Sequence, residues 1–272
     1  MSEENKILED WCKEAELDYK NALLLKNKIV PLLEGAHKKF GSIFDRIYLE
    51  QKEGMELKLE NSGRLLTILK KIDKRLFTTE EIKAVSLHFE LVPLVEGFYT
   101  SQVDFLILLL IANGIEFKPY KKRKSIYTLQ EIETIDLSLK LEFLGKQGFS
   151  ELIINENTFR ALRNSTAHMS YRILQGLNVK TKNCIVSDED YAKLYDYLRE
   201  VSYSMFNAQR LFYEIHFGKL SANDLKRIKN SKLKRVSCAN CGRDNLVVES
   251  KNVIGFEPTF CTSCLKVLKP KP

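Results

Sequence analysis

Four of the six cysteines in this chain stand in two closely spaced pairs near its C-terminus. Two residues separate Cys238 from Cys241, two separate Cys261 from Cys264, and nineteen lie between the inner cysteines. A C-x-x-C turn lets two thiolates point at one ion, and two such turns supply the four tetrahedral ligands that Zn²⁺ takes in closed structural sites. The spacing therefore predicts a structural zinc site built from Cys238, Cys241, Cys261 and Cys264.

The residues between the two pairs indicate short strands. The segment 245–254 favours strand over helix, and Gly242 follows the first pair, where a tight turn benefits from a residue without Cβ. Two C-x-x-C turns around short strands resemble a zinc ribbon. Disulfides or a redox pair are the alternatives. They are less favoured, because a redox motif needs a single C-x-x-C and nothing in the sequence suggests secretion.

Residues 1–218 carry the pattern of a helical domain. Gly and Pro are few, Leu, Lys and Glu are many, and apolar residues recur at spacings of three and four. A chain of 272 residues also exceeds the usual size of one domain. We therefore expect a mainly α fold, with a helical domain over residues 1–218, a basic linker over 219–235 and a zinc ribbon with short β-strands over 236–272.

Local signals mark where individual helices begin and end. The segment Thr78–Glu81 combines a hydroxyl residue with acids in the following turn, which indicates a helix start. Pro31 and Gly35 are expected to interrupt the chain after a first helix. Further helices are expected over residues 65–76, 129–144 and 157–173, with a basic loop over residues 116–125.

The longest apolar helix is expected over residues 94–111, with Asn113 and Gly114 ending it. Its longest uninterrupted apolar run, Phe105–Ala112, is far shorter than the roughly 20 residues needed to cross a bilayer. We therefore interpret it as a buried helix of a protein without a membrane partner. A last long helix is expected over residues 190–217.

The N-terminal residues and the isolated side chains bear on location. Residues 1–6 are polar and acidic, so no signal sequence is predicted and a reducing cytoplasm is expected. Cys12 and Cys184 stand alone and are interpreted as free thiols. The histidines without polar company in the sequence are interpreted as structural or surface residues, namely His37, His88 and His216.

Positive charge is concentrated at the C-terminal end. The whole chain has a formal net charge of +7. Residues 219–272 hold 12 Lys and Arg against 4 Asp and Glu, while the preceding 218 residues hold 31 against 32. The densest basic stretch is Lys226–Arg235. A basic stretch beside a zinc ribbon favours nucleic-acid contact through phosphate neutralisation, and the alternative is a solvated linker.

The segment Phe159–Ile173 is the most informative part of the helical region. On a helix with about 100° per residue, its apolar side chains form one stripe that faces the core. This stripe consists of Phe159, Leu162, Thr166, Met169 and Ile173.

Polar side chains occupy the opposite face of this predicted helix. Asn164 and His168 are four residues apart and share that face, with Arg160 and Tyr171 beside them. Arg163 lies between the two faces, and its long side chain can swing toward His168. The alternative interpretation is an ordinary solvated helix face.

The six residues from Arg163 to His168 resemble the R-x4-6-H motif of the HEPN superfamily, including the polar residue that often follows the arginine. That family is all-helical and carries the motif late in a helical bundle, so the resemblance covers about residues 1–217. A variant of the family pattern has a tyrosine two residues after the histidine. Ser170 stands at that position and Tyr171 follows it, so no role is carried over to the tyrosine.

The resemblance implies metal-independent RNA cleavage. The ribose 2′-OH attacks the adjacent phosphorus and leaves a 2′,3′-cyclic phosphate and a 5′-OH end. His168 would transfer a proton near neutral pH, Arg163 would hold the phosphate, and Asn164 would orient the phosphate or the imidazole. Because the family pairs two motifs across a two-fold dimer, a homodimer is expected.

Two functions follow from this resemblance. The first is an endoribonuclease whose zinc ribbon and basic stretch recruit RNA, and family members of this kind often act as toxins or in antiviral defence. The second is a non-catalytic HEPN-like dimeric adapter that binds nucleic acid or protein through its ribbon. The enzyme is favoured, because Arg163, Asn164 and His168 are all present.

Overall fold

The structure is a computed structural model of the whole chain. It describes residues 2–41, 43–54, 57, 64, 78–120, 129–152, 156–218, 221–230, 232–242, 244–249 and 261. The helix expected over residues 65–76, the basic loop beyond residue 120 and the fourth predicted zinc ligand, Cys264, lie outside these residues.

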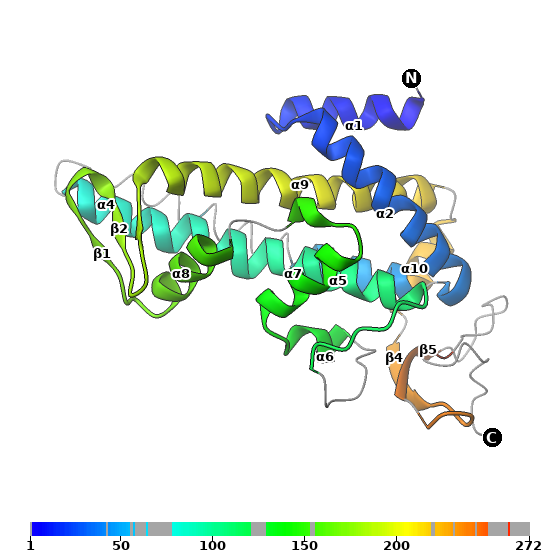
Figure 1. The fold of residues 1–272 in the computed structure, drawn as a ribbon. Coiled ribbons are helices and arrows are strands. Elements are labelled where there is room, and N and C mark those ends of the chain that lie inside the picture. The colour runs from blue at the N-terminus through cyan, green and yellow to red at the C-terminus, as the bar shows by residue number, and fades with distance from the viewer. Residues whose placement is uncertain are drawn as a thin grey trace. The chain divides into compact units, whose positions relative to one another are not determined.

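The protein is mainly helical, which confirms the predicted class (Figure 1). Contacts divide it into two compact units. The first unit comprises residues 1–52, 103–136 and 203–272, and the second comprises residues 53–102 and 137–202. These units are defined by spatial contacts rather than by chain order, so the division at residues 218 and 235 stays a prediction.

The first unit begins with two capped helices, α1 (Glu3–Glu14) and α2 (Tyr19–Phe40). The side chain of Asp18 accepts a hydrogen bond from the backbone N–H of Lys20 at 2.8 Å, which satisfies a donor that the first turn of α2 leaves unpaired. Helix α1 packs on α2 and on the long helix α9 (Asp188–Gly218). The buried residues of this contact are Leu8, Cys12, Ala22 and Leu211.

Helix α2 continues through Pro31 and Gly35, so the predicted interruption is wrong. A tertiary contact is made at this part of the helix. The side chain of Asn113 donates hydrogen bonds to the carbonyls of Leu32 and Leu109, at 2.9 and 2.8 Å. A Cβ at Gly35 would lie 2.2 Å from Oδ1 of Asn113, so glycine permits this close approach.

Residue Gly41, with a φ of 53°, follows the last residue of α2, and residues 43–54 form the next helical stretch. The first unit also holds α6 (Leu129–Glu133), whereas the next helix, α7 (Leu137–Lys146), belongs to the second unit. The helix expected over residues 129–144 is therefore two helices.

A long helical segment runs from residue 79 to residue 112. It begins with α4 (Thr79–Ser86), where Thr78 and Glu81 form the expected capping box. Two π-helical segments follow, η2 (Leu87–Leu91) and η3 (Pro93–Tyr99), and α5 (Thr100–Ala112) completes it. Gly114, with a φ of 94°, lies just beyond the predicted end of the helix.

This segment is long and apolar enough to span a membrane by length and composition. However, 72% of its most apolar window is buried inside the protein, as in the core helix of a soluble protein. The prediction of a buried helix is therefore confirmed. The predicted last long helix is also confirmed as α9.

The second unit contains a small sheet that the sequence did not indicate. After the 3₁₀ turn η4 (Ser150–Leu152) and helix α8 (Glu156–Ala167), the chain forms three short antiparallel strands around the 3₁₀ turn η5 (Gln175–Leu177). These strands are β1 (Arg172–Ile173), β2 (Val179–Lys180) and β3 (Ile185–Val186). They pair in chain order, with Arg172 opposite Lys180 and Val179 opposite Val186.

The C-terminal segment forms α10 (Ala222–Asn230) and an antiparallel pair, β4 (Lys232–Ser237) and β5 (Asp244–Glu249). Lys232 lies opposite Glu249 and Ser237 opposite Asp244. Strand β5 agrees with the strand expected from residue 245. Residues 219–235, which the sequence predicts as a basic linker, contain α10 and most of β4. In α10, Ile228 is buried and Lys226 is exposed.

Candidate functional site

The first candidate site lies at the C-terminal end of α8. The helix expected over residues 157–173 ends at Ala167, so the prediction is wrong beyond that residue. The backbone N–H of Ser170 donates to the carbonyl of Ser165 at 2.7 Å, and that of Met169 donates to Thr166 at 3.1 Å. This pair of bonds is a Schellman motif, which requires a left-handed residue, and Met169 has a φ of 51°.

Because α8 ends at Ala167, only part of the predicted core-facing stripe lies on the helix. Phe159, Leu162 and Thr166 are buried, as the periodicity predicts. Met169 is 77% exposed, because the left-handed turn points the chain away from the core face, and Ile173 lies in β1. The prediction of a core-facing stripe is therefore confirmed within α8 and wrong for the residues after it.

Arg163 is held by Glu96, a residue of η3. Its Nε donates to Oε1 of Glu96 at 2.5 Å, and its Nη2 donates to Oε2 at 3.1 Å. Its Nη1 donates to Oδ1 of Asn164 at 3.4 Å. The guanidinium thus turns toward η3 and the adjacent amide, rather than toward His168 as the sequence suggested. About a third of each ionic side chain remains exposed, 32% for Arg163 and 38% for Glu96.

His168 and Asn164 are both exposed at this helix end. The backbone N–H of His168 donates to the carbonyl of Asn164 at 3.1 Å, so the last α-helical hydrogen bond joins the two residues. No hydrogen bond to the imidazole occurs within the described part of the chain. Arg163 and Asn164 are therefore in side-chain contact, and His168 follows them one turn later.

His88 and Tyr171 form an aromatic pair in the same unit. The ring of His88, from η2, is 5.7 Å from the ring of Tyr171, measured between centroids. Burial raises the pKa of Tyr171, so the phenol stays protonated at neutral pH. His88 thus has an aromatic neighbour that the sequence did not predict.

Glu96 is the residue of this site that sequence reasoning missed. It is separated from Arg163 by 67 positions, so no local spacing connects them. One signal was present, because Glu96 is the single acidic residue between Val92 and Val103 in an otherwise apolar and small-polar stretch. An acid in such a stretch is informative when an arginine elsewhere lacks a partner.

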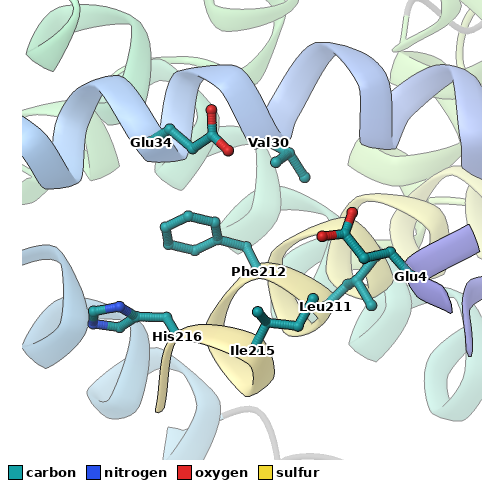
Figure 2. Close-up of a pocket in the computed structure, with 7 residues that line it drawn as sticks. All are labelled: Glu4, Val30, Glu34, Leu211, Phe212, Ile215 and His216. Carbon is teal, nitrogen blue, oxygen red and sulfur yellow. The ribbon is translucent and has the colours of Figure 1, made fainter. Parts of the chain in front are cut away.

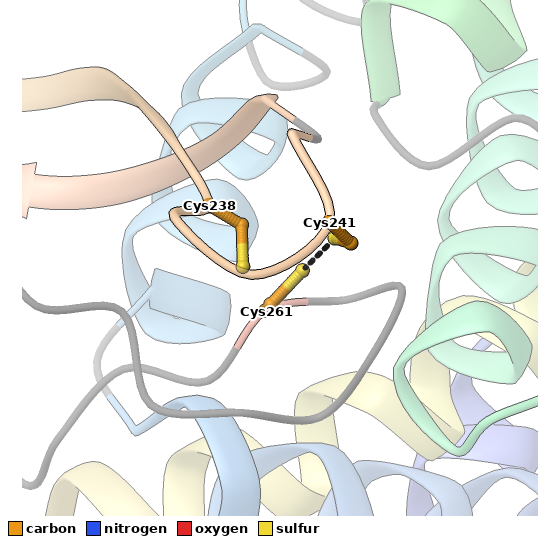
Figure 3. Close-up of side chains that lie close together, drawn as sticks. All are labelled: Cys238, Cys241 and Cys261. Carbon is orange, nitrogen blue, oxygen red and sulfur yellow. Dashed lines mark hydrogen bonds between the residues drawn. The ribbon is translucent and has the colours of Figure 1, made fainter.

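The second candidate site is the cysteine cluster. The sulfurs of Cys238, Cys241 and Cys261 all lie within 4.8 Å of one another (Figure 3). The Sγ atoms of Cys241 and Cys261 are 3.5 Å apart, and none of the three cysteines forms a disulfide with another described cysteine. That separation is far longer than a disulfide of about 2.05 Å. It is close to the roughly 3.8 Å edge of a tetrahedral zinc–thiolate site.

The turn that carries the first pair is built as the sequence predicts. The backbone N–H of Gly242 donates to the carbonyl of Cys238 at 2.8 Å, and Gly242 has a φ of 69°. Cys238 and Cys261 are buried, whereas Cys241 is exposed. Three of the four predicted ligands therefore converge in a way that fits a metal ion. Cys12 and Cys184 form no disulfide with another described cysteine, as the sequence predicts.

Comparison with known proteins assigns no family to the chain: no family model matches it, and no curated protein or solved structure matches it significantly.

Proposed function

We propose that this protein is a metal-independent endoribonuclease of the HEPN type. The observation that carries the proposal is the arrangement at the end of α8. An exposed imidazole, His168, follows one turn after an exposed amide, Asn164, and a guanidinium that Glu96 and Asn164 hold in place. These are the three groups that cleavage through a 2′-OH needs: a proton carrier, a hydrogen-bonding amide and a fixed cation.

The proposed reaction uses these groups as follows. An imidazole removes the proton from the ribose 2′-OH, and the oxygen forms a bond to the adjacent phosphorus. The bond from phosphorus to the 5′ oxygen breaks, and that oxygen takes a proton from a second imidazole. If two motifs pair across a dimer, as in the family that the motif resembles, the two copies of His168 supply the base and the acid.

Arg163 would stabilise the negative charge that builds on the phosphate oxygens. Because Glu96 occupies Nε and Nη2, the Nη1 edge beside Asn164 is the part that would receive the phosphate. A guanidinium already fixed by an ion pair loses little conformational entropy when the substrate arrives.

The same ion pair supports a second candidate, a non-catalytic adapter. In this account Arg163 and Glu96 hold α8 against η3, and the carboxylate cancels the charge that would attract a phosphate. RNA or protein would then bind through the C-terminal segment, where Lys226 is exposed. We favour the enzyme, because the adapter account assigns no role to the exposed His168.

We further propose that the cysteine cluster holds a structural zinc ion, with Cys264 as its fourth ligand, in a zinc ribbon that helps to recruit RNA. Thiolates at this spacing suit a closed zinc site. A homodimer, a cytoplasmic location and a role as a toxin or in defence extend the same proposal.

The experiment is RNA cleavage by the purified full chain with EDTA in the buffer, and with the zinc content of the protein measured in the same sample. Wild type should cleave, His168→Ala should not, and His88→Ala should cleave like wild type. If His168→Ala cleaves as well as wild type, the enzyme proposal fails.

A further inference from the structure

A second group of metal-ligating side chains lies in the first unit, apart from the cysteine cluster. It consists of His37 from α2, Asp45 from the helical stretch 43–54, and His216 from α9. Nε2 of His37 lies 3.2 Å from Oδ2 of Asp45, and Nε2 of His216 lies 3.1 Å from the same oxygen. Two consecutive helical segments and the distant helix α9, whose His216 lies 171 positions from Asp45, thus meet at one carboxylate.

Asp45 is the most deeply buried member of this group. Its side chain is only 2% exposed, whereas those of His37 and His216 are 27% and 20% exposed. Burial by itself raises the pKa of Asp45, but hydrogen bonds from His216 and His37 outweigh burial and hold the pKa below its usual value. The carboxylate is therefore charged at neutral pH, which is the form that binds a metal ion.

The two carboxylate oxygens of Asp45 differ in their hydrogen bonding. Oδ1 is buried and lies 3.2 Å from Nε2 of His37, but it accepts no hydrogen bond of good geometry within the described residues. The phenol of Tyr213 is buried nearby, and burial together with the Asp45 charge raises its pKa. A buried carboxylate oxygen without a hydrogen bond is costly, and an ion that binds the carboxylate would offset that cost.

The distances suit metal coordination. In a site with bonds of about 2.0–2.1 Å to nitrogen and oxygen, neighbouring ligand atoms lie about 3.0–3.4 Å apart. The two Nε2–Oδ2 distances, 3.1 and 3.2 Å, fall in this range. Both histidines also present the same ring atom, Nε2, and the three ligand atoms all lie within 4.8 Å of one another.

A cavity of about 180 Å³ opens beside the group, and His216 is part of its wall (Figure 2). Glu34 from α2 and Glu4 from α1 also line it, so two further carboxylates face the same space. The carboxylate of Glu4 is paired with Lys26 at 3.2 Å. The cavity gives water and small ions a route to His216, and its acidic wall favours cations.

We propose that His37, Asp45 and His216 form a second metal site, which binds a first-row divalent transition metal ion such as Zn²⁺. Two imidazole nitrogens and one carboxylate oxygen form a donor set that such ions accept, and it leaves at least one coordination position for water. This site goes beyond the proposed ribonuclease and does not depend on it. By joining α2, residues 43–54 and α9, the ion would stabilise the first unit.

The alternative is a purely structural cluster, in which each histidine donates Nε2–H to Asp45 and no metal binds. Substitution by glutamine separates the two accounts. His37→Gln and His216→Gln keep a side-chain N–H donor for Asp45 but remove the imidazole ligand. His88→Gln, in the second unit, is the matched control.

The experiment is a titration of the metal-free full chain with Co²⁺, followed by absorption spectroscopy. The first class of sites should give the intense thiolate-to-cobalt charge-transfer band of the cysteine cluster. A second equivalent should give visible bands without additional thiolate intensity. His37→Gln and His216→Gln should lose this second equivalent and keep the thiolate band, while His88→Gln should keep both.

Metal analysis after equilibration with Zn²⁺ gives an independent readout. Wild type should retain two ions per chain, and each glutamine variant should retain one. The double variant Cys238→Ser/Cys241→Ser should retain only the ion of the histidine site. The proposal is overturned if the glutamine variants bind as much metal as wild type, or if the second equivalent of Co²⁺ produces no new bands. Because the cobalt spectra of wild type distinguish the two sites, the test does not require the cysteine variant to fold.

Discussion

Glu96 accepts hydrogen bonds from both Nε and Nη2 of Arg163, at 2.5 and 3.1 Å. This contact bears directly on the two functional accounts. In the ribonuclease account, the carboxylate fixes the guanidinium and leaves Nη1 for a phosphate. In the adapter account, it neutralises the guanidinium and only ties η3 to α8.

The first prediction is that Glu96→Gln tightens RNA binding several-fold, because it removes a negative charge beside the proposed phosphate position. Stability should fall by less than about 1 kcal/mol, since the pair is about a third exposed. Fluorescence anisotropy with a 2′-O-methyl RNA, which cannot be cleaved through the 2′-OH, measures the affinity.

Glu142→Gln is the control for that measurement. Glu142 forms an exposed ion pair with Lys146 in α7 of the same unit, so its substitution changes net charge equally. It should leave RNA affinity nearly unchanged. Equal effects of the two substitutions would show that only overall charge matters, and would remove Glu96 from the site.

The second prediction concerns the shape of the cation. Arg163→Ala should reduce cleavage by roughly 10²–10³-fold, as is typical when one group that stabilises transition-state charge is lost. Arg163→Lys should recover only part of that loss, because an ammonium cannot pair with Glu96 and a phosphate in the same planar geometry. Lys180→Ala, an exposed cation of β2, controls for net charge and should cleave like wild type.

Features that depend on residues close together in the sequence can be predicted from it, whereas features that depend on distant residues cannot. The capping box at Thr78 and Glu81 spans one helical turn, so the residues themselves indicate it. The interruption expected at Pro31 and Gly35 is wrong, and the close approach of Asn113 to Gly35 joins residues almost eighty positions apart. The sequence pattern of α2 alone does not indicate that contact.

The candidate sites follow the same rule. The C-x-x-C spacing is local, and three of its cysteines converge as expected. The end of α8 is not signalled, because Met169 takes the left-handed position that glycine usually fills. Glu96 and Asp45 reach their partners only through tertiary structure, so the periodicity of their own segments could not identify either contact.

The third prediction tests the packing of α2. Gly35→Ala should destabilise the protein by about 1–3 kcal/mol, because the new Cβ meets Oδ1 of Asn113 and displaces an amide that makes two hydrogen bonds. Gly54→Ala is the matched control, since a Cβ there meets nothing within 4 Å. Urea denaturation should show the control as neutral or slightly more stable. A neutral Gly35→Ala would contradict the account of this contact.

The fourth prediction concerns Tyr99, which is fully buried and donates a hydrogen bond to the carbonyl of Leu152 at 2.7 Å. Tyr99→Phe should cost about 1 kcal/mol of stability at neutral pH. Burial raises the pKa of Tyr99, with a smaller contribution from Tyr197. The contribution of Tyr99 to stability is therefore complete below the unfolded pKa of about 10 and decreases as the pH rises above it.

Denaturation of both proteins between pH 7 and pH 11 measures this effect. Wild type should lose more stability than Tyr99→Phe above about pH 10, because only wild type can ionise this tyrosine on unfolding. Identical alkaline slopes would show that Tyr99 is not protected from ionisation in the folded protein.

The central claim is that His168 and Arg163 cleave RNA through the 2′-OH, and the ends of the products test it most directly. Wild type, treated with EDTA and shown to retain its zinc, is incubated with an RNA and with a matched strand that carries 2′-deoxyribose throughout. The account predicts fragments with a 2′,3′-cyclic phosphate and a 5′-OH, no cleavage of the deoxy strand, and a loss of roughly 10²–10⁴-fold in His168→Ala. Fragments with a 5′-phosphate, cleavage of the deoxy strand, or no cleavage by wild type of any RNA tested would contradict it.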